Sequence, residues 1–172
     1  MKIIVDSMLG DIVVWLRLGG IDTIYIDSKE SDAEILKLLN RNTLLVSGDK
    51  ELIKCAKRRN FQVLLITQGN TAEKVALILA MIGIRKYEVG ENSRCVYCNS
   101  KLIRIKDKKH FEDFVRYYKI ENVKYFEKNA PYFFCERCRK FYWKGRMWKN
   151  IEKMIKAING ELRRISKKCS TI

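Results

Sequence analysis

Three aspartates, Asp6, Asp32 and Asp49, stand where an apolar segment ends or where a helix is expected to begin. Asp6 directly follows the β-branched run at residues 3–5, which is typical of a buried strand. Because the carboxyl ends of parallel strands open on one edge of a sheet, the three side chains are expected to meet there. Carboxylates suit Mg²⁺ and Mn²⁺, ions that activate water for phosphodiester hydrolysis. The pattern therefore predicts a magnesium or manganese site with hydrolytic chemistry.

Each aspartate also has a purely structural interpretation. Asp6 and Asp49 are well placed to cap the helices that follow them. Asp32 falls in a first helical turn, where a negative charge is favourable for the helix dipole alone. Taken singly, no aspartate separates the two interpretations, and it is their combination that favours a metal site.

Four of the six cysteines form two C-x-x-C pairs, Cys95 with Cys98 and Cys135 with Cys138. Four thiolates make the closed tetrahedral set of a structural zinc site, and they leave no open position for catalysis. A redox dithiol is the weaker interpretation, because the sequence has two C-x-x-C pairs and a redox site needs only one. The sequence therefore predicts structural Zn²⁺, with the aromatic and basic run at residues 139–145 in a zinc-ribbon hairpin.

Charge and aromatic residues are concentrated in the second half of the chain. Residues 1–90 carry 13 Lys and Arg against 11 Asp and Glu, whereas residues 91–172 carry 22 against 9. Of the 18 aromatic residues, 14 lie in that second part. Cations bind phosphates and exposed aromatic faces stack on unpaired bases, so a nucleic acid is the expected partner. The alternative for most of these aromatics is that they form the core of a small domain.

Strand and helix patterns alternate through the first 90 residues, which predicts an α/β fold with a parallel sheet covered on both faces. The expected strands cover residues 2–5, 23–26, 43–46 and 62–66. Helical spacing follows each strand, with Ser31 and Glu34 forming a capping box and the last of these helices covering residues 71–82.

The expected division is a domain at 1–90, a zinc-ribbon domain with a helical insert at 91–146, and a C-terminal helix with a basic tail at 147–172. The insert is expected to hold a helix at residues 110–118, and the tail from residue 163 is expected to be frayed. No targeting signal or membrane span is evident in the sequence, so a cytoplasmic location without a membrane partner is the simplest expectation.

These residues resemble the RNase family named after the C-terminal domain of the Mut-seven protein, a PIN-like domain followed by a zinc ribbon. The resemblance runs from Lys2 to about Met147. It is carried by Asp6 with Met8-Leu9, Trp15-Leu16-Arg17 with Gly20 and Asp22, Asp32, Ser47-Gly48-Asp49 with Leu52, Arg94-Cys95-x-x-Cys98-Asn99, and Cys135-x-x-Cys138 with Tyr142-Trp143-x-Gly145.

The resemblance implies a metal-dependent ribonuclease acting on single-stranded or looped RNA. By position, Asp6, Asp32 and Asp49 would be its metal-binding acids. Ser47 would supply the small hydroxyl of the PIN-type turn, and Arg17 would lie near the site.

PIN centres usually have a fourth acid after the fourth strand, where this sequence reads Thr67-Gln68-Gly69-Asn70. A second hypothesis is therefore an RNA- or ribosome-binding adaptor with a degenerate site. Another PIN-plus-ribbon family matures ribosomal RNA, which makes the ribosome or its RNA an expected partner. A DNA-binding regulator is the weakest alternative, because no recognition-helix module is visible.

Overall fold

We describe residues 1–119, 132–145 and 147–169 of a computed structural model of the protein. The first part of the chain forms a parallel sheet in the order β2-β1-β3-β4, which confirms the predicted α/β class. Its strands are β1 (Lys2–Val5), β2 (Thr23–Tyr25), β3 (Thr43–Ser47) and β4 (Gln62–Leu65).

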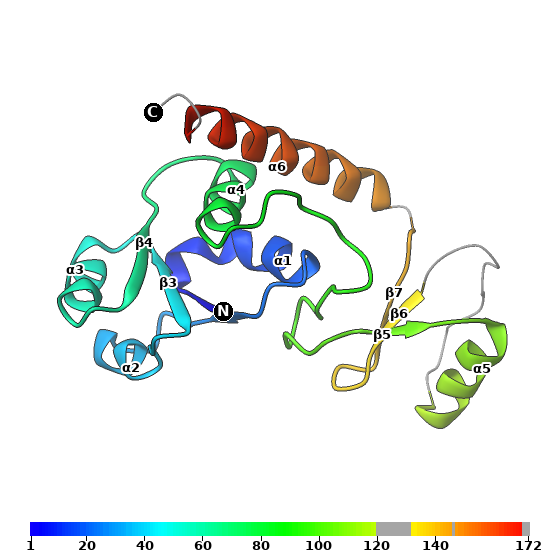
Figure 1. The fold of residues 1–172 in the computed structure, drawn as a ribbon. Helices are drawn as coiled ribbons and strands as arrows, with labels where there is room; N and C mark the ends of the chain where they lie inside the picture. Colours follow the sequence, from blue (N-terminus) through cyan, green and yellow to red (C-terminus); the bar gives the residue numbers. More distant parts are fainter. Residues whose placement is uncertain (120–131, 146, 170–172) are drawn as a thin grey trace.

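Helices cover both faces of this sheet (Figure 1). Because successive strand residues point to opposite faces, Ile3 and Val5 pack with α1 and α4, whereas Ile4 packs with α2 and α3. A polar side chain inside this three-layer core would be costly to bury, so the polar residues stand where the strands end. The helices are η1 (Ser7–Leu9), α1 (Gly10–Leu18), α2 (Asp32–Lys37), α3 (Lys50–Arg58) and α4 (Thr71–Met81).

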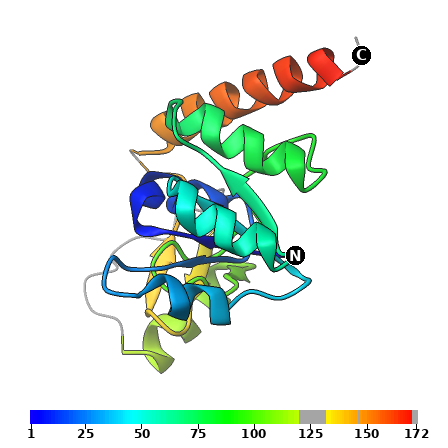
Figure 2. The same cartoon turned by 90° about the vertical axis from the view of Figure 1, so that its left-hand side faces the viewer.

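A long helix, α6 (Trp148–Cys169), returns to this first part of the chain and lies across α4 (Figures 1 and 2). Its residues Ile158 and Leu162 are buried in the same core as α1 and α4. The expectation of a tail that frays from residue 163 is wrong, because the helix continues to Cys169. Ile165 still packs against the core, and Arg164 pairs with Glu161 at 3.0 Å. The last three residues lie outside the described part.

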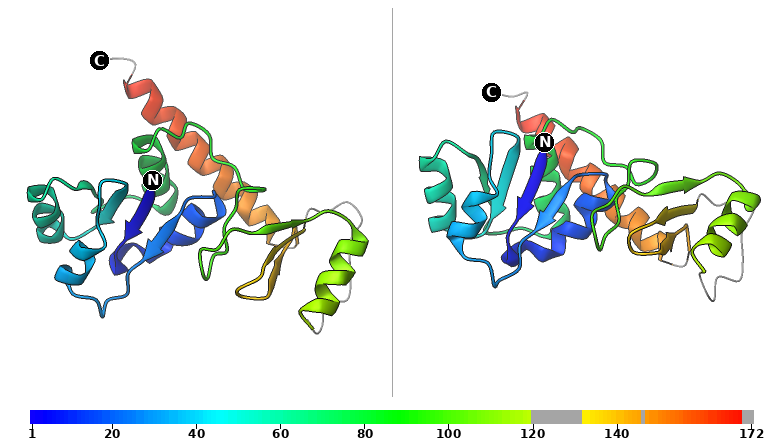
Figure 3. Two further views of the ribbon diagram at one scale, coloured as in Figure 1. Left: turned by 60° about the horizontal axis from the view of Figure 1, so that its bottom comes forward. Right: turned by 90° about the horizontal axis from the view of Figure 1, so that it is seen from below.

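The second part of the chain, which we call the ribbon, is an antiparallel sheet of β5 (Ile103–Ile105), β6 (Tyr132–Cys135) and β7 (Lys140–Tyr142) in that order. It lies with α5 (Lys108–Tyr117) at one end of the molecule (Figure 3). The helix begins two residues before the expected start, because Asp107 caps it by accepting a hydrogen bond from the His110 N–H at 2.8 Å.

The aromatics of the ribbon divide into two groups. Phe111, Tyr132 and Phe134 are buried in a small core with Ile105, with Phe114 packed against them. The structural interpretation is thus confirmed for this first group. Others, such as Trp143, remain half exposed. Across the described residues, no helix is both long and apolar enough to cross a bilayer.

Candidate functional site

Asp6 is a buried carboxylate at the carboxyl end of β1, with 5% of its surface exposed. It caps η1, because its Oδ1 accepts a hydrogen bond from the Met8 N–H at 2.9 Å. Its Oδ2 accepts a second bond from the hydroxyl of Ser47, at the end of the adjacent strand β3. A buried carboxylate is costly unless it is hydrogen-bonded. Both oxygens of Asp6 are satisfied, and its orientation is fixed.

Asp49 is joined to Asp6 through the same hydroxyl, since the Asp49 N–H donates to Ser47 Oγ at 2.8 Å. The Asp49 side chain caps α3, and its Oδ1 accepts from the N–H groups of Glu51 and Leu52 at 2.7 and 3.1 Å. The capping interpretation is therefore confirmed for both aspartates. It leaves Asp49 Oδ2 without a hydrogen-bond donor among the residues described, at the same sheet edge as Asp6.

Asp32 is the first residue of α2 and is exposed. It does not cap that helix. The predicted capping box does so, because Ser31 Oγ accepts from the Glu34 N–H at 3.4 Å while Glu34 Oε2 accepts from the Ser31 N–H at 2.8 Å. The structure links Asp6 and Asp49 through Ser47, but none of the contacts among the described residues joins Asp32 to either of them.

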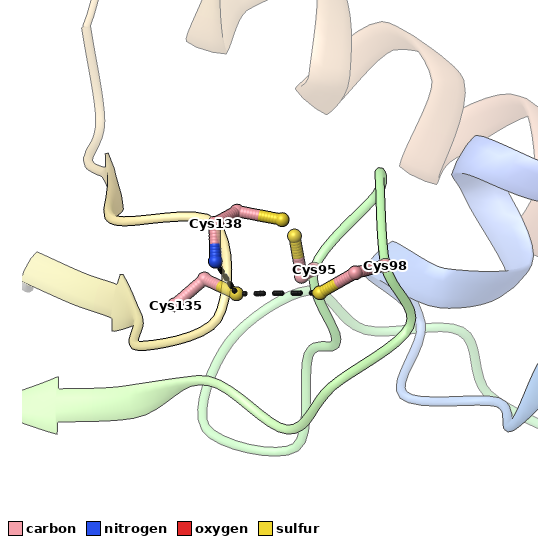
Figure 4. A group of neighbouring side chains, drawn as sticks. All are labelled: Cys95, Cys98, Cys135 and Cys138. Carbon is pink, nitrogen blue, oxygen red and sulfur yellow. Dashed lines mark hydrogen bonds between the residues drawn. The ribbon is translucent and has the colours of Figure 1, made fainter.

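The four cysteines of the two C-x-x-C pairs converge into one cluster (Figure 4). Their Sγ atoms all lie within 4.8 Å of one another, and Cys98 Sγ and Cys135 Sγ are 3.4 Å apart. Four sulfurs at 2.3 Å from a zinc ion would be separated by about 3.8 Å. Over the described part of the chain, this is the one group of three or more metal-binding side chains that comes together. The cluster therefore has the donors and the spacing to hold zinc.

The electrostatics of the cluster also suit a cation. Burial alone would raise the pKa of the Cys98 thiol, but hydrogen bonds with the side chain and backbone of Ser100 and with neighbouring thiols outweigh it and lower the pKa to about 6. Burial raises the pKa of Cys135 above its usual range. Zinc binds thiolates, so the ion would supply the positive charge that a buried Cys135 thiolate lacks.

Arg17 does not lie with the aspartates, which corrects the position that the family resemblance implied. It stands in the last turn of α1, which runs back across the sheet from the Asp6 edge to the opposite edge. Its Nε and Nη2 donate to the Thr23 carbonyl at 3.1 and 3.0 Å, and its Nη1 donates to the carbonyls of Val96 and Tyr97 at 2.7 and 3.2 Å. Arg17 therefore fastens the first cysteine knuckle to the α/β sheet.

The same junction holds residues to which sequence reasoning gave no role. Asn99 has a positive φ of 64° in the knuckle, and its side chain donates to Asp22 Oδ1 at 2.6 Å and accepts from the Thr23 N–H at 3.2 Å. Arg94 pairs with Asp22 at 3.6 Å and donates to the Gly20 carbonyl. Asp22, Arg94 and Asn99 were part of the family pattern, but nothing in their spacing showed that they join the two parts.

Replacing Arg17 with methionine is expected to lower the free energy of unfolding by about 2–4 kcal/mol, because three carbonyls would lose a charged donor at a largely buried junction. Urea denaturation followed by circular dichroism measures this. Arg58→Met, at the exposed end of α3, is the matched control and should change stability by less than about 0.5 kcal/mol. Equal stability of the two variants would contradict the role of Arg17 as a fastener.

The family model of the Mut7-C RNAse domain matches residues 1–155, which include the aspartates, the junction and all four clustered cysteines. No curated protein and no solved structure matches the chain. The chain belongs to the Mut7-C RNAse domain family.

Proposed function

We propose that the protein is a metal-dependent endoribonuclease with a PIN-like centre at the carboxyl edge of the parallel sheet. Membership of an RNase domain family supports RNA as the substrate. The observation that carries the proposal is the pairing of Asp6 and Asp49 through the Ser47 hydroxyl, which places a buried carboxylate next to one with an unused oxygen. A fold that needed only helix caps has no reason to bury Asp6 against a hydroxyl.

The donor set fits the proposed cation. Asp6, Asp49 and Asp32 offer only oxygen atoms, which suit Mg²⁺ or Mn²⁺ better than a soft metal. Such a cation, when bound, would activate water and neutralise charge on the cleaved phosphate. The chain's own contribution is orientation: Ser47 holds one oxygen of Asp6, and the N–H groups of Glu51 and Leu52 at the start of α3 hold one oxygen of Asp49.

No fourth acid comes from the start of α4. Glu73 is used in a capping box, because its Oε2 accepts from the Asn70 N–H at 2.8 Å while Asn70 Oδ1 accepts from the Glu73 N–H at 3.1 Å. Asp11, at the start of α1, binds the Thr71 hydroxyl at 2.8 Å and Lys74 at 3.2 Å. The proposed centre therefore rests on Asp6 and Asp49, and Asp32 at the N-terminus of α2 is its candidate third ligand.

The ribbon would hold the RNA. Its exposed cations stand along β5 and at the start of α5, at Arg104, Lys106, Lys108 and Lys109. Lysine and arginine bind phosphates without regard to sequence, and single-stranded or looped RNA also offers bases for stacking. Zinc in the cysteine cluster would stabilise the shape of this surface. It would take no part in hydrolysis, since four cysteines leave it no open coordination position.

The test is cleavage of a labelled single-stranded RNA by protein dialysed free of magnesium and manganese, with and without added Mn²⁺. Wild-type protein is expected to cut only when Mn²⁺ or Mg²⁺ is present, and Asp6→Asn/Asp49→Asn is expected to cut at background rate. Cleavage by the double variant at the wild-type rate would overturn the proposal.

A second candidate function is that of an RNA- or ribosome-binding adaptor without hydrolysis. It is favoured because, among the described residues, Asp32 makes no contact with the other two aspartates, and because Glu73 is used as a cap. The same assay decides between the two. Tight, salt-dependent RNA binding without metal-dependent cleavage would establish the adaptor.

A further inference from the structure

A large cavity separates the ribbon from the start of α6, at the end of α1 opposite Asp6. Its volume is about 800 Å³, which is within the range of small-molecule and cofactor sites. Its walls combine aromatic and apolar side chains with two cations and one carboxylate. Among the lining residues are Phe141, Trp143, Trp148, Arg104, Lys144 and Glu91. Neither the cysteine cluster nor the proposed catalytic edge uses this cavity.

Each of the two tryptophan side chains in the wall makes a contact that fixes its indole ring. Trp143 has its ring 6.4 Å from that of Tyr132 at an interplanar angle of 27°, and it keeps 54% of its surface exposed. Gly145 makes this placement possible, since a Cβ there would lie 2.9 Å from Trp143 Nε1. The indole N–H of Trp148 donates to Glu152 Oε1 at 2.6 Å. An aromatic face that is both exposed and fixed is what stacking on a base requires.

The cations of the cavity are placed for a phosphate. Lys144 Nζ lies 4.6 Å from the Trp148 ring centroid, so that its position is favoured by a cation–π contact. Arg104 lines the same wall, where it pairs with Glu91. With two cations against one carboxylate, the lining carries a net positive charge. An apolar peptide would match the aromatics but would leave this charge unused.

We propose that this cavity binds one unpaired nucleotide of the RNA, with the base stacked on Trp143 and its phosphate on Lys144. The inference rests on the proposed function for its ligand class but not on hydrolysis. Helix α1 alone separates the cavity from the Asp6 edge by roughly 14 Å, taking 1.5 Å per residue. The site would therefore anchor the RNA a few nucleotides away from the scissile phosphate.

The test is fluorescence anisotropy with a 5′-labelled single-stranded 12-nucleotide RNA and the full chain carrying Asp6→Asn, so that binding is measured without cleavage. In that background Trp143→Leu is expected to weaken binding about tenfold, and Trp143→Phe to restore most of the affinity, because it restores a stacking face. Lys144→Gln should reduce the dependence of log Kd on log salt by about 0.7, the value for one lost phosphate contact.

Tyr97→Leu is the matched control. Tyr97 is an exposed aromatic of the same ribbon that is also covered by a lysine, with Lys140 Nζ at 4.7 Å, but it lies outside the cavity. RNA binding that responds equally to Tyr97→Leu and Trp143→Leu, or to neither, would overturn the site. Either result is independent of whether wild-type protein cleaves RNA. Thermal melting checks that each variant is folded.

Discussion

Replacing Cys135 with serine is expected to remove bound zinc and to unfold the ribbon. Cys95 and Cys135 are fully buried, and the ribbon's other core is a cluster of four buried side chains. A core of this size is too small to be stable alone, whereas a structural zinc site contributes about 10–16 kcal/mol of binding free energy. The variant is expected to melt more than about 10 °C below the wild type.

Metal analysis by mass spectrometry and melting by circular dichroism measure the two effects. Wild-type protein should contain one zinc per chain, and a strong chelator should reproduce the melting behaviour of Cys135→Ser. Cys55→Ser is the matched control, because Cys55 is a half-buried cysteine outside the cluster and belongs to the core under α3. Full zinc content in Cys135→Ser would show that the cluster is not the zinc site.

Replacing Asp6 with asparagine is expected to lower the single-turnover rate of RNA cleavage at least about 1000-fold, equivalent to about 4 kcal/mol of transition-state stabilisation. The amide is the same size as the carboxylate but carries no charge for a cation. Asp49→Asn should lose a similar factor while remaining folded, since asparagine is as good a helix cap as aspartate. Both losses would be measured at saturating Mn²⁺ with the RNA in deficit.

Asp32→Asn is the informative member of this series. Ser31 and Glu34 cap α2 without it, so the substitution should leave stability unchanged and report on catalysis alone. If Asp32 joins the metal site, its loss should cost at least about tenfold in rate at limiting Mn²⁺. An unaltered rate would remove Asp32 from the site and leave a centre built on Asp6 and Asp49. Ser47→Ala tests the hydroxyl in the same way.

The elements of the fold could be predicted from the sequence because their signals are local. Apolar runs predicted the four parallel strands, and the capping box at Ser31 predicted the start of α2. The spacing within the two C-x-x-C pairs is typical of a zinc site, so the convergence of the four cysteines was predictable as well. The bounds of the four parallel strands and of α4 were therefore predicted to within one residue.

Contacts between distant segments could not be predicted in this way. Arg17 and its partner Val96 are 79 positions apart along the chain, and nothing near Arg17 indicates that partner. The pattern of α6 predicted an amphipathic helix but not the surface that its apolar face covers, which proved to be α4. For the candidate site, the ends of the parallel strands predicted that Asp6 and Asp49 would lie at one sheet edge, and the family resemblance added Ser47. The position of Asp32 depends on the β2–α2 connection, whose sequence has no periodic pattern.

The packing of α6 has a consequence for how the protein is made. Ile158 and Leu162 complete a core whose other members, such as Leu16 and Leu79, are synthesised long before them. Chains emerge from the ribosome N-terminus first, and a core with such distant partners closes late. The ribbon, whose own contacts lie between β5 and β7, has therefore left the ribosome before the sheet that precedes it can be fully covered. Until α6 has been synthesised, the apolar face of α4 is therefore exposed, and the nascent chain is prone to aggregation at that surface.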